Sequence, residues 1–538
     1  MRRAFTWVLL ICGLFQGMAT AEQLSYEKKV SDIGQVIHMV KTQYAPLLYK
    51  KARLGLDVDE LQKKYVQRAK ETTTAEFYYL VLKMIAEFKD SHFSARVPTT
   101  HLSHLGFFCD LVQGKILIEY IDRGVLPRSV FPFSVGDEVV SMGGEPALEV
   151  ARRNASYIGD GNEETSLRFG SMLLAYRPGS VIPVELGDTT VAVRNGSSKV
   201  EKTVTLTWKE AGEPLDEFNP KKNFLAVLPP KSSKKTFRQY ELSFRHKLEN
   251  MVPNMELGYL CSPFTRIHIP EDATTLMVDP VLAYYHPTPK GNIGYLRIPH
   301  YIPPIGPNGE EDFTGYLRQF EWVISKLEEK TVGLVIDQDH NCGGSVAFLE
   351  SMAGLFIREP FTPIQFQFLA SKSEYLNFKS WMDTEHQTLE NEYYAQTVEL
   401  IKKHWLLGDF LTPKTTFLNN QKVYPNPIGY TKPLLILIDE MAGSGGDAFP
   451  ALLQGVGRAK LLGNHTMGAG GHVETMPPLN ASAISISMTK SLFFRPDGVA
   501  IENRGAEPDF PYLPTREDFL SEYRGYQKFY LNKILDML

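Results

Sequence analysis

The sequence predicts a multidomain α/β protein, in which a helical N-terminal domain and a β-rich domain precede a core with a mostly parallel βαβ sheet. Its length of 538 residues is enough for several domains. Apolar residues recur at helical spacing up to about residue 90, and short β-rich runs with turn signals follow up to about residue 210. From residue 291 onward strands alternate with helices, which is typical of a parallel sheet.

The first 21 residues have the features of a secretory signal. Arg2 and Arg3 are followed by an apolar run over residues 5–15, and Ala19-Thr20-Ala21 has the small side chains of a cleavage site. This run is too short to span a bilayer, which takes about 20 residues. We therefore expect an exported protein, periplasmic or secreted, without stable membrane insertion.

Residues 22–102 form the predicted helical segment. Asp57 precedes acidic residues at the expected start of its middle helix. The apolar stripes are Val30, Ile33, Ile37, Val40 and Tyr44 in the first helix, and Phe77, Val81, Met84, Ile85 and Phe88 in the last.

Residues 103–210 form the predicted β-domain. Residues 115–121 are β-rich, and Asn195-Gly196 predicts a hairpin between strands at 189–193 and 200–208. The segment 133–144, with a Gly-Asp pair before a strand and a Gly-Gly turn, resembles the core of PDZ domains. The resemblance implies binding of an extended peptide by strand addition. A plain β-domain without a ligand is the alternative.

Residues 211–290, interrupted by prolines, are predicted to be a linker or an inhibitory insertion. The core, residues 291–538, begins with a strand at 293–298 and a helix at 312–328. A strand at 332–336, a helix from about 345, an irregular stretch at 370–430 and a buried strand at 434–438 follow.

Composition excludes several classes of function. The formal net charge is −5, without the basic patch of a nucleic-acid-binding protein. Cys109, Cys261 and Cys342 follow the signal, an odd number that leaves at least one thiol unpaired. The sequence has no His-Glu-x-x-His and no paired Cys-x-x-Cys, so we expect neither a metal nor a cofactor.

Ser444 is the candidate nucleophile. It follows the strand 434–438 on a small-residue turn, and a helix begins directly behind it. Helix N–H groups at such a turn, that of Gly445 first, point at a bound oxyanion. Gly343 and Gly344 follow the other buried strand and are candidates for the second oxyanion donor; an ordinary strand-end turn is the alternative.

Four ordered motifs in residues 291–509 resemble the tail-specific (C-terminal-processing) protease family. They are Asp337-x-x-x-Asn341-x-Gly343-Gly344, Ser444-x-Gly446-Asp447, Gly463-x-x-Thr466-x-Gly468, and Gly498-x-x-x-Glu502-x-x-Gly505-x-x-Pro508-Asp509. The resemblance implies a serine endopeptidase. One departure is Ala469, where the Ser-Lys branch of the family has its catalytic lysine.

The tricorn-like Ser-His-Glu branch takes its base from an upstream histidine, which corresponds here to His92 in Phe88-Lys-Asp-Ser-His-Phe. Glu502 corresponds to the acid of that branch. His340 and His472 are the alternatives for the base, because both lie in loops of the motifs. The resemblance also implies a zymogen, because a secreted member of this branch nicks itself in a segment placed like 211–290.

The sequence thus predicts a Ser444–His92–Glu502 protease acting on protein or peptide substrates, with no nucleic-acid partner, and leaves a homodimer open. Two other functions stay open. One is an α/β-hydrolase-type esterase that uses a downstream histidine such as His465. The other is a catalytically inactive peptide- or ligand-binding protein on the same fold.

Overall fold

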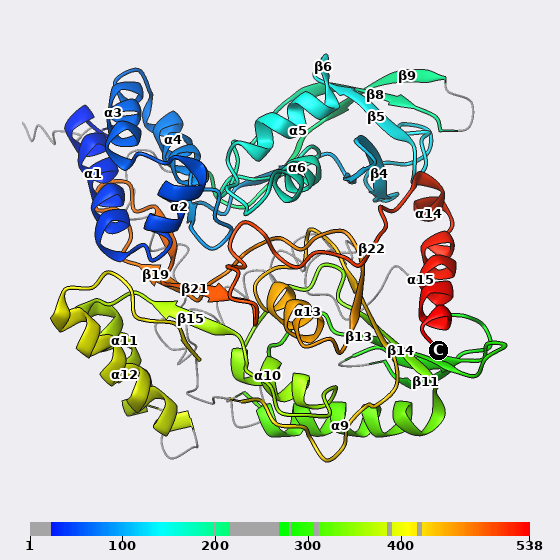
Figure 1. Cartoon of the computed structure of the whole chain (residues 1–538). Helices are drawn as coiled ribbons and strands as arrows, with labels where there is room; N and C mark the ends of the chain where they lie inside the picture. Colours follow the sequence, from blue (N-terminus) through cyan, green and yellow to red (C-terminus); the bar gives the residue numbers. More distant parts are fainter. Residues whose placement is uncertain are drawn as a thin grey trace, which may run out of the picture.

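The computed structural model describes residues 23–196, 200–215, 268–278, 281–304, 311–384, 390–416 and 422–538. Figure 1 shows an N-terminal group of helices, a separate group of strands with two helices, and a core that carries the C-terminal helix. The predicted α/β multidomain fold class is confirmed. The predicted signal, residues 1–21, lies outside the described residues.

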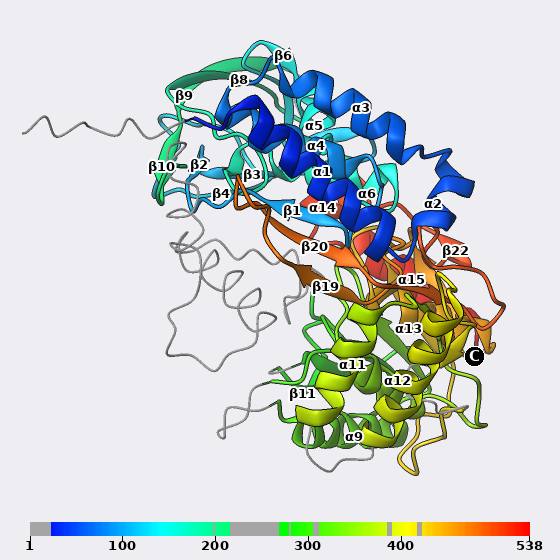
Figure 2. The ribbon, with the colours of Figure 1, turned by 90° about the vertical axis from the view of Figure 1, so that its left-hand side faces the viewer.

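The N-terminal helices pack against strands from the other end of the chain. The helices are α1 (Tyr26–Gln43), α2 (Leu47–Leu54), α3 (Val58–Ala69) and α4 (Thr74–Ala86). As predicted, a helix starts at Asp57, whose carboxylate caps α3 by accepting the N–H groups of Asp59 and Glu60. The core of this region includes Met476, Ile486 and other C-terminal side chains. Its sheet has the order β1 (Ser94–Arg96), β20 (Ser485–Thr489), β19 (Val473–Met476), and Figure 2 shows β19 and β20 running beside the N-terminal helices.

The β-domain has the predicted hairpin, because β8 (Asp188–Arg194) pairs antiparallel with β9 (Glu201–Thr207). These strands continue a sheet of β3 (Phe107–Val112), β4 (Lys115–Ile121) and β5 (Glu138–Met142), with β6 (Glu145–Pro146) beside β5. Helices α5 (Ala147–Ala155) and α6 (Glu163–Met172) accompany them. A small sheet of β10 (Lys209–Ala211), β2 (Leu102–His104) and β7 (Tyr176–Pro178) lies next to this domain.

The core sheet has seven strands, ordered β11 (Thr274–Met277), β12 (Ala283–His286), β13 (Ile293–Arg297), β14 (Gly333–Asp337), β17 (Leu434–Ile438), β18 (Lys460–Gly463) and β22 (Phe510–Pro511). From β13 to β22 neighbouring strands are parallel, while β11 and β12 are antiparallel. Helices α9 (Phe313–Lys330), α10 (Val346–Gly354) and α13 (Gly445–Gly455) share a hydrophobic core with one face. Helix α15 (Arg524–Asp536), which follows α14 (Arg516–Leu520), packs on the other. Helices on both faces explain why β14 and β17 are entirely apolar up to their last residues.

One sequence expectation was wrong. The stretch 370–430 contains two helices, α11 (Lys372–Thr384) and α12 (Glu390–Leu407). It also contributes β16 (Thr415–Thr416), which with β15 (Gln365–Phe368) and β21 (Ser491–Phe494) forms a three-stranded sheet. Among the described side chains of these helices, Phe378, Val398 and Ile401 reach the core. Many of the other described side chains of these helices are polar, which leaves little apolar periodicity at those positions.

The last part of the segment 211–290 belongs to the core sheet. Strands β11 and β12 come from the end of the segment 211–290 and join the core sheet, while residues 216–267 and 279–280 lie outside the described residues. Cys109 is a buried free thiol, as the odd cysteine count requires, and Cys342 is disulfide-bonded. Among the described residues, no helix is long and apolar enough to cross a membrane.

Candidate active site

Ser444 lies where the central strand β17 leads into α13, so the predicted strand–turn–helix is confirmed. Its backbone has φ 59° and ψ −113°, a strained conformation for a residue with a side chain. Ser444 is partly exposed although its neighbours Gly443 and Gly445 are buried. A strained strand-to-helix turn of this kind presents a serine hydroxyl at the carboxyl edge of a parallel sheet.

Asp447 fixes this turn from inside α13, a role that the sequence motif did not reveal. Its buried carboxylate accepts the Ser444 N–H at 2.7 Å. It also accepts the hydroxyl of Thr466 and the N–H groups of Gly468 and Ala469, at 2.5, 2.7 and 2.9 Å. Burial raises the pKa of Asp447 to about 6. The hydrogen bonds lower this pKa, because they favour the ionised form, but they only partly offset the effect of burial. One carboxylate thus joins the serine turn to the loop 466–469.

The glycine-rich loop after β14 touches the serine turn. A Cβ at Gly343, which has φ 76°, would lie 2.6 Å from both Ser444 Cβ and Gly445 N, so only glycine fits there. Gly343 donates its own N–H to the side chain of Asn341 at 2.8 Å, which removes it as an oxyanion donor. Of the two candidates in this loop, the geometry therefore favours Gly344.

His92 stands on a turn built by Asp90. The Asp90 carboxylate accepts the N–H of His92 at 2.9 Å and that of Phe93 at 3.2 Å. It also accepts hydroxyls from α1 and β20 regions, those of Tyr44 at 2.7 Å and Thr489 at 2.8 Å. Asp90 is buried while His92 is partly exposed, so hydrogen bonds from the buried carboxylate hold the turn that carries the imidazole.

Glu502 is fully buried and paired with Lys50 of α2. Its other carboxylate oxygen accepts the Gly470 N–H at 3.0 Å. Burial, followed by the nearby Asp90 carboxylate, raises the pKa of Glu502 to about 8, whereas Lys50 and the Gly470 N–H oppose this rise. Lys50 also donates to the carbonyl of Lys89 at 2.7 Å, so it bridges the glutamate to the turn of His92. No sequence pattern pointed to Lys50.

Hydrogen bonds connect the segments that carry the three predicted triad residues. Met467 donates its N–H to the carbonyl of Ala442 beside the serine turn, and its carbonyl accepts from the Asn162 side chain, at 2.8 and 2.9 Å. The preceding residue, Gly161, donates to the Ser91 hydroxyl at 3.0 Å. Residues from distant parts of the chain therefore link the serine turn to the turn of His92.

The rival histidines are held elsewhere. His340 lies 2.9 Å from Asp439 through Nδ1 and 3.2 Å from the Arg168 guanidinium through Nε2. Although burial opposes it, His340 and Arg168 hold the pKa of Asp439 well below its usual range. His472 contacts Ser491 through Nδ1 and Glu374 through Nε2. Both ring nitrogens of His340 have polar partners, and His472 faces Ser491 and Glu374, which disfavours either as the catalytic base.

Two family models match parts of this chain. Residues 292–512 match the model of peptidase family S41, and residues 101–217 match that of a PDZ domain. An uncharacterized protein of Chlamydia muridarum is 25% identical over 601 residues, covering 99% of this chain and 96% of the relative.

Solved structures of mature CPAF share the fold. One has a TM-score of 0.76 at 21% identity and covers 94% of this chain and 95% of that chain. Another, in complex with lactacystin, has a TM-score of 0.76 at 22% identity, with 95% and 97% covered. The Asp-Ser-His-Phe turn, the signal-like N-terminus and the segment 211–290 likewise look most like this chlamydial protease-like activity factor.

Proposed function

We propose that the chain is a serine endopeptidase of the tail-specific protease family, which cleaves protein substrates through an acyl-enzyme on Ser444, with His92 and Glu502 completing a triad. The observation that carries this proposal is the strained turn of Ser444 packed against the Gly343 loop. A serine held in this way at the edge of the sheet needs only a base to become nucleophilic. His92, on its rigid turn, supplies that base.

The proposed reaction follows the logic of a serine triad. Ser444 Oγ attacks the scissile carbonyl while His92 takes its proton, and His92 then protonates the leaving amine. Water hydrolyses the acyl-enzyme by the same two proton transfers. Ionised Glu502 stabilises the imidazolium that forms on His92.

Two backbone N–H groups would bind the oxyanion, that of Gly445 at the start of α13 and that of Gly344. Because the Gly343 N–H already donates to the Asn341 side chain, Gly344 is the better candidate for the second oxyanion donor. The positive end of α13 adds to the stabilisation of negative charge.

The PDZ-like domain would capture an extended segment of substrate by strand addition. We further propose export through residues 1–21 and latency through the segment 211–290. A segment tethered in the same chain meets the active site at an effective concentration of around millimolar, so even weak contacts would block it.

Casein digestion by four proteins tests the proposal: wild type, Ser444→Ala, His92→Ala and the double variant. Each single change should lower the rate by several orders of magnitude, and the double variant should be no worse, because triad members act as a unit. His465→Ala is the matched control. It removes the downstream histidine that an esterase would use, and that histidine instead pairs with Glu164 at 2.7 Å.

A fluorophosphonate label on Ser444 separates the remaining alternatives, and lactacystin, which one solved structure of mature CPAF contains, is a second probe. A catalytically inactive binding protein would take up no label. Near-normal proteolysis by His92→Ala would remove His92 as the base.

A further inference from the structure

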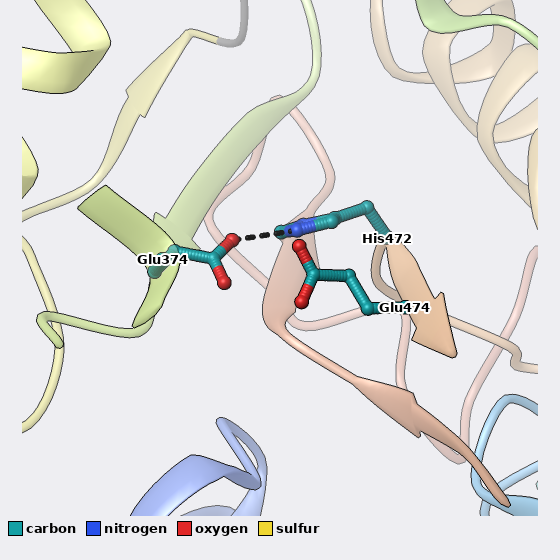
Figure 3. Close-up of side chains that lie close together, drawn as sticks. All are labelled: Glu374, His472 and Glu474. Atoms are coloured by element: carbon teal, nitrogen blue, oxygen red, sulfur yellow. Dashed lines mark ion pairs between the residues drawn. The ribbon is translucent and has the colours of Figure 1, made fainter. Parts of the chain in front are cut away.

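A second polar cluster lies outside the proposed active site, between α11 and β19. Glu374 comes from the first turn of α11, His472 directly precedes β19, and Glu474 lies on β19. One possible ligand atom from each lies within 4.8 Å of the others, and Figure 3 shows the three side chains converging. We propose that this cluster binds a divalent transition-metal ion, with Zn²⁺ as the ion that fits it best.

The buried carboxylate of Glu374 gives the strongest support for a metal site. Its side chain has no exposed surface, and among the described residues neither carboxylate oxygen takes part in a hydrogen bond. Its Oε1 lies 2.7 Å from Nε2 of His472, an ion-pair contact without hydrogen-bond geometry. A buried carboxylate normally needs donors or a cation to offset the loss of hydration. Here its oxygens point at the other two candidate ligands.

The other two candidate ligands are held in place from behind. Nδ1 of His472 lies 2.9 Å from the Ser491 hydroxyl, which leaves Nε2 on the side of Glu374. Asn377 donates to one oxygen of Glu474, and Lys490 Nζ lies 3.7 Å from the other. Supporting contacts of this kind orient the ligands of metal sites.

The donor set fits zinc. One imidazole nitrogen and two carboxylates are accepted ligands of Zn²⁺, and three protein ligands leave a fourth position for water. The expectation of no metal rested on linear motifs, whereas these donors come from segments about a hundred residues apart. The competing explanation is an ion pair in which protonated His472 lies between the two glutamates.

Such an ion would brace the proposed active site. His472 follows Gly470 by two residues, and the Gly470 N–H holds Glu502 at 3.0 Å. A metal at His472 would tie this segment to α11.

The test uses full-length Ser444→Ala protein, which cannot process itself. After exposure to Zn²⁺ and gel filtration, elemental analysis should find about one zinc per chain, and X-ray absorption should show one imidazole with oxygen donors. Glu374→Gln and His472→Gln, made in this background, should each weaken Zn²⁺ binding by at least tenfold. Ser491→Ala, which perturbs only the support of His472, should weaken it less.

Two control variants locate the ion. His465→Gln removes an exposed histidine–glutamate pair, and His92→Ala removes the proposed base; both should retain the zinc. Circular dichroism checks that every variant is folded. The proposal fails if the parent protein holds no zinc after filtration, as the ion-pair explanation requires. It also fails if Glu374→Gln binds zinc as the parent does, or if only His92→Ala loses it.

Discussion

Replacing Lys50 by methionine should weaken both the fold and the proposed catalysis. The ammonium contacts the carboxylate of Glu502, and it also donates to the Lys89 carbonyl and the Asn503 side chain, each at 2.7 Å. Both members of the Lys50–Glu502 pair have no exposed side-chain surface. Removing one partner of such a buried pair costs about 3–5 kcal/mol of unfolding free energy, because the carboxyl of Glu502 is then left buried without its partner.

The same change acts on the chemistry through the pKa of Glu502. Lys50 lowers that pKa, so without it the pKa rises beyond the present value of about 8, and the ionised carboxylate, already the minor form near pH 7, becomes rarer still. A neutral acid stabilises the imidazolium poorly, and we expect a rate loss of about 10²–10⁴-fold near pH 7. The double change Lys50→Met with Glu502→Gln should recover much of the stability, since no buried charge then remains, but not the activity.

Urea unfolding in the Ser444→Ala background measures the stability, and casein turnover measures the rate. Lys41→Met is the matched control, because Lys41 pairs with Asp59 at an exposed site and should cost less than about 1 kcal/mol. If Lys50→Met unfolds at the same urea concentration as Lys41→Met and keeps its activity, the reasoning about the buried pair is wrong.

Three further predictions concern the pH dependence, the glycine-rich loop and the maturation of the chain. Between about pH 5 and 9, wild-type activity should rise as the histidine base and then Glu502 lose their protons. The pKa of Glu502 is raised to about 8, so its proton is lost in the upper part of this range. In Glu502→Gln that upper part of the rise should be absent. A flat wild-type profile would contradict a histidine base. Gly343→Ala should cost at least about 10²-fold in kcat/KM, because its Cβ displaces the serine turn. Gly408→Ala, with a similar φ of 81° but open space around it, should leave kcat/KM unchanged. Wild-type protein should mature into two fragments that stay associated and that run at about 25 and 30 kDa on a denaturing gel, as estimated from chain length. The Ser444→Ala protein should stay a single chain. If both proteins stay intact while wild type digests casein, the latency proposal fails.

Local patterns predicted a large part of the fold. The apolar strands at 332–336 and 434–438 became β14 and β17, because burial on both faces leaves an uninterrupted apolar run in the sequence. Asp57 and the hairpin after residue 194 also form where they were expected, since capping and hairpin connections depend on neighbouring residues. Helices α11 and α12 were missed, because few of their described side chains reach the core.

The sequence by itself determined the serine turn, because the strand, the small residues and the following helix are contiguous around Ser444. Only the tertiary structure decided which groups surround it. Lys50 contacts Glu502, which is 452 residues further along the chain, and Glu374 of α11 lies close to His472 beside β19. Gly343 also loses its N–H to Asn341 through the shape of one loop. Charge pairing and hydrogen bonding act over a few ångströms in space, so partners that are distant in the chain leave no spacing in the sequence from which to predict them.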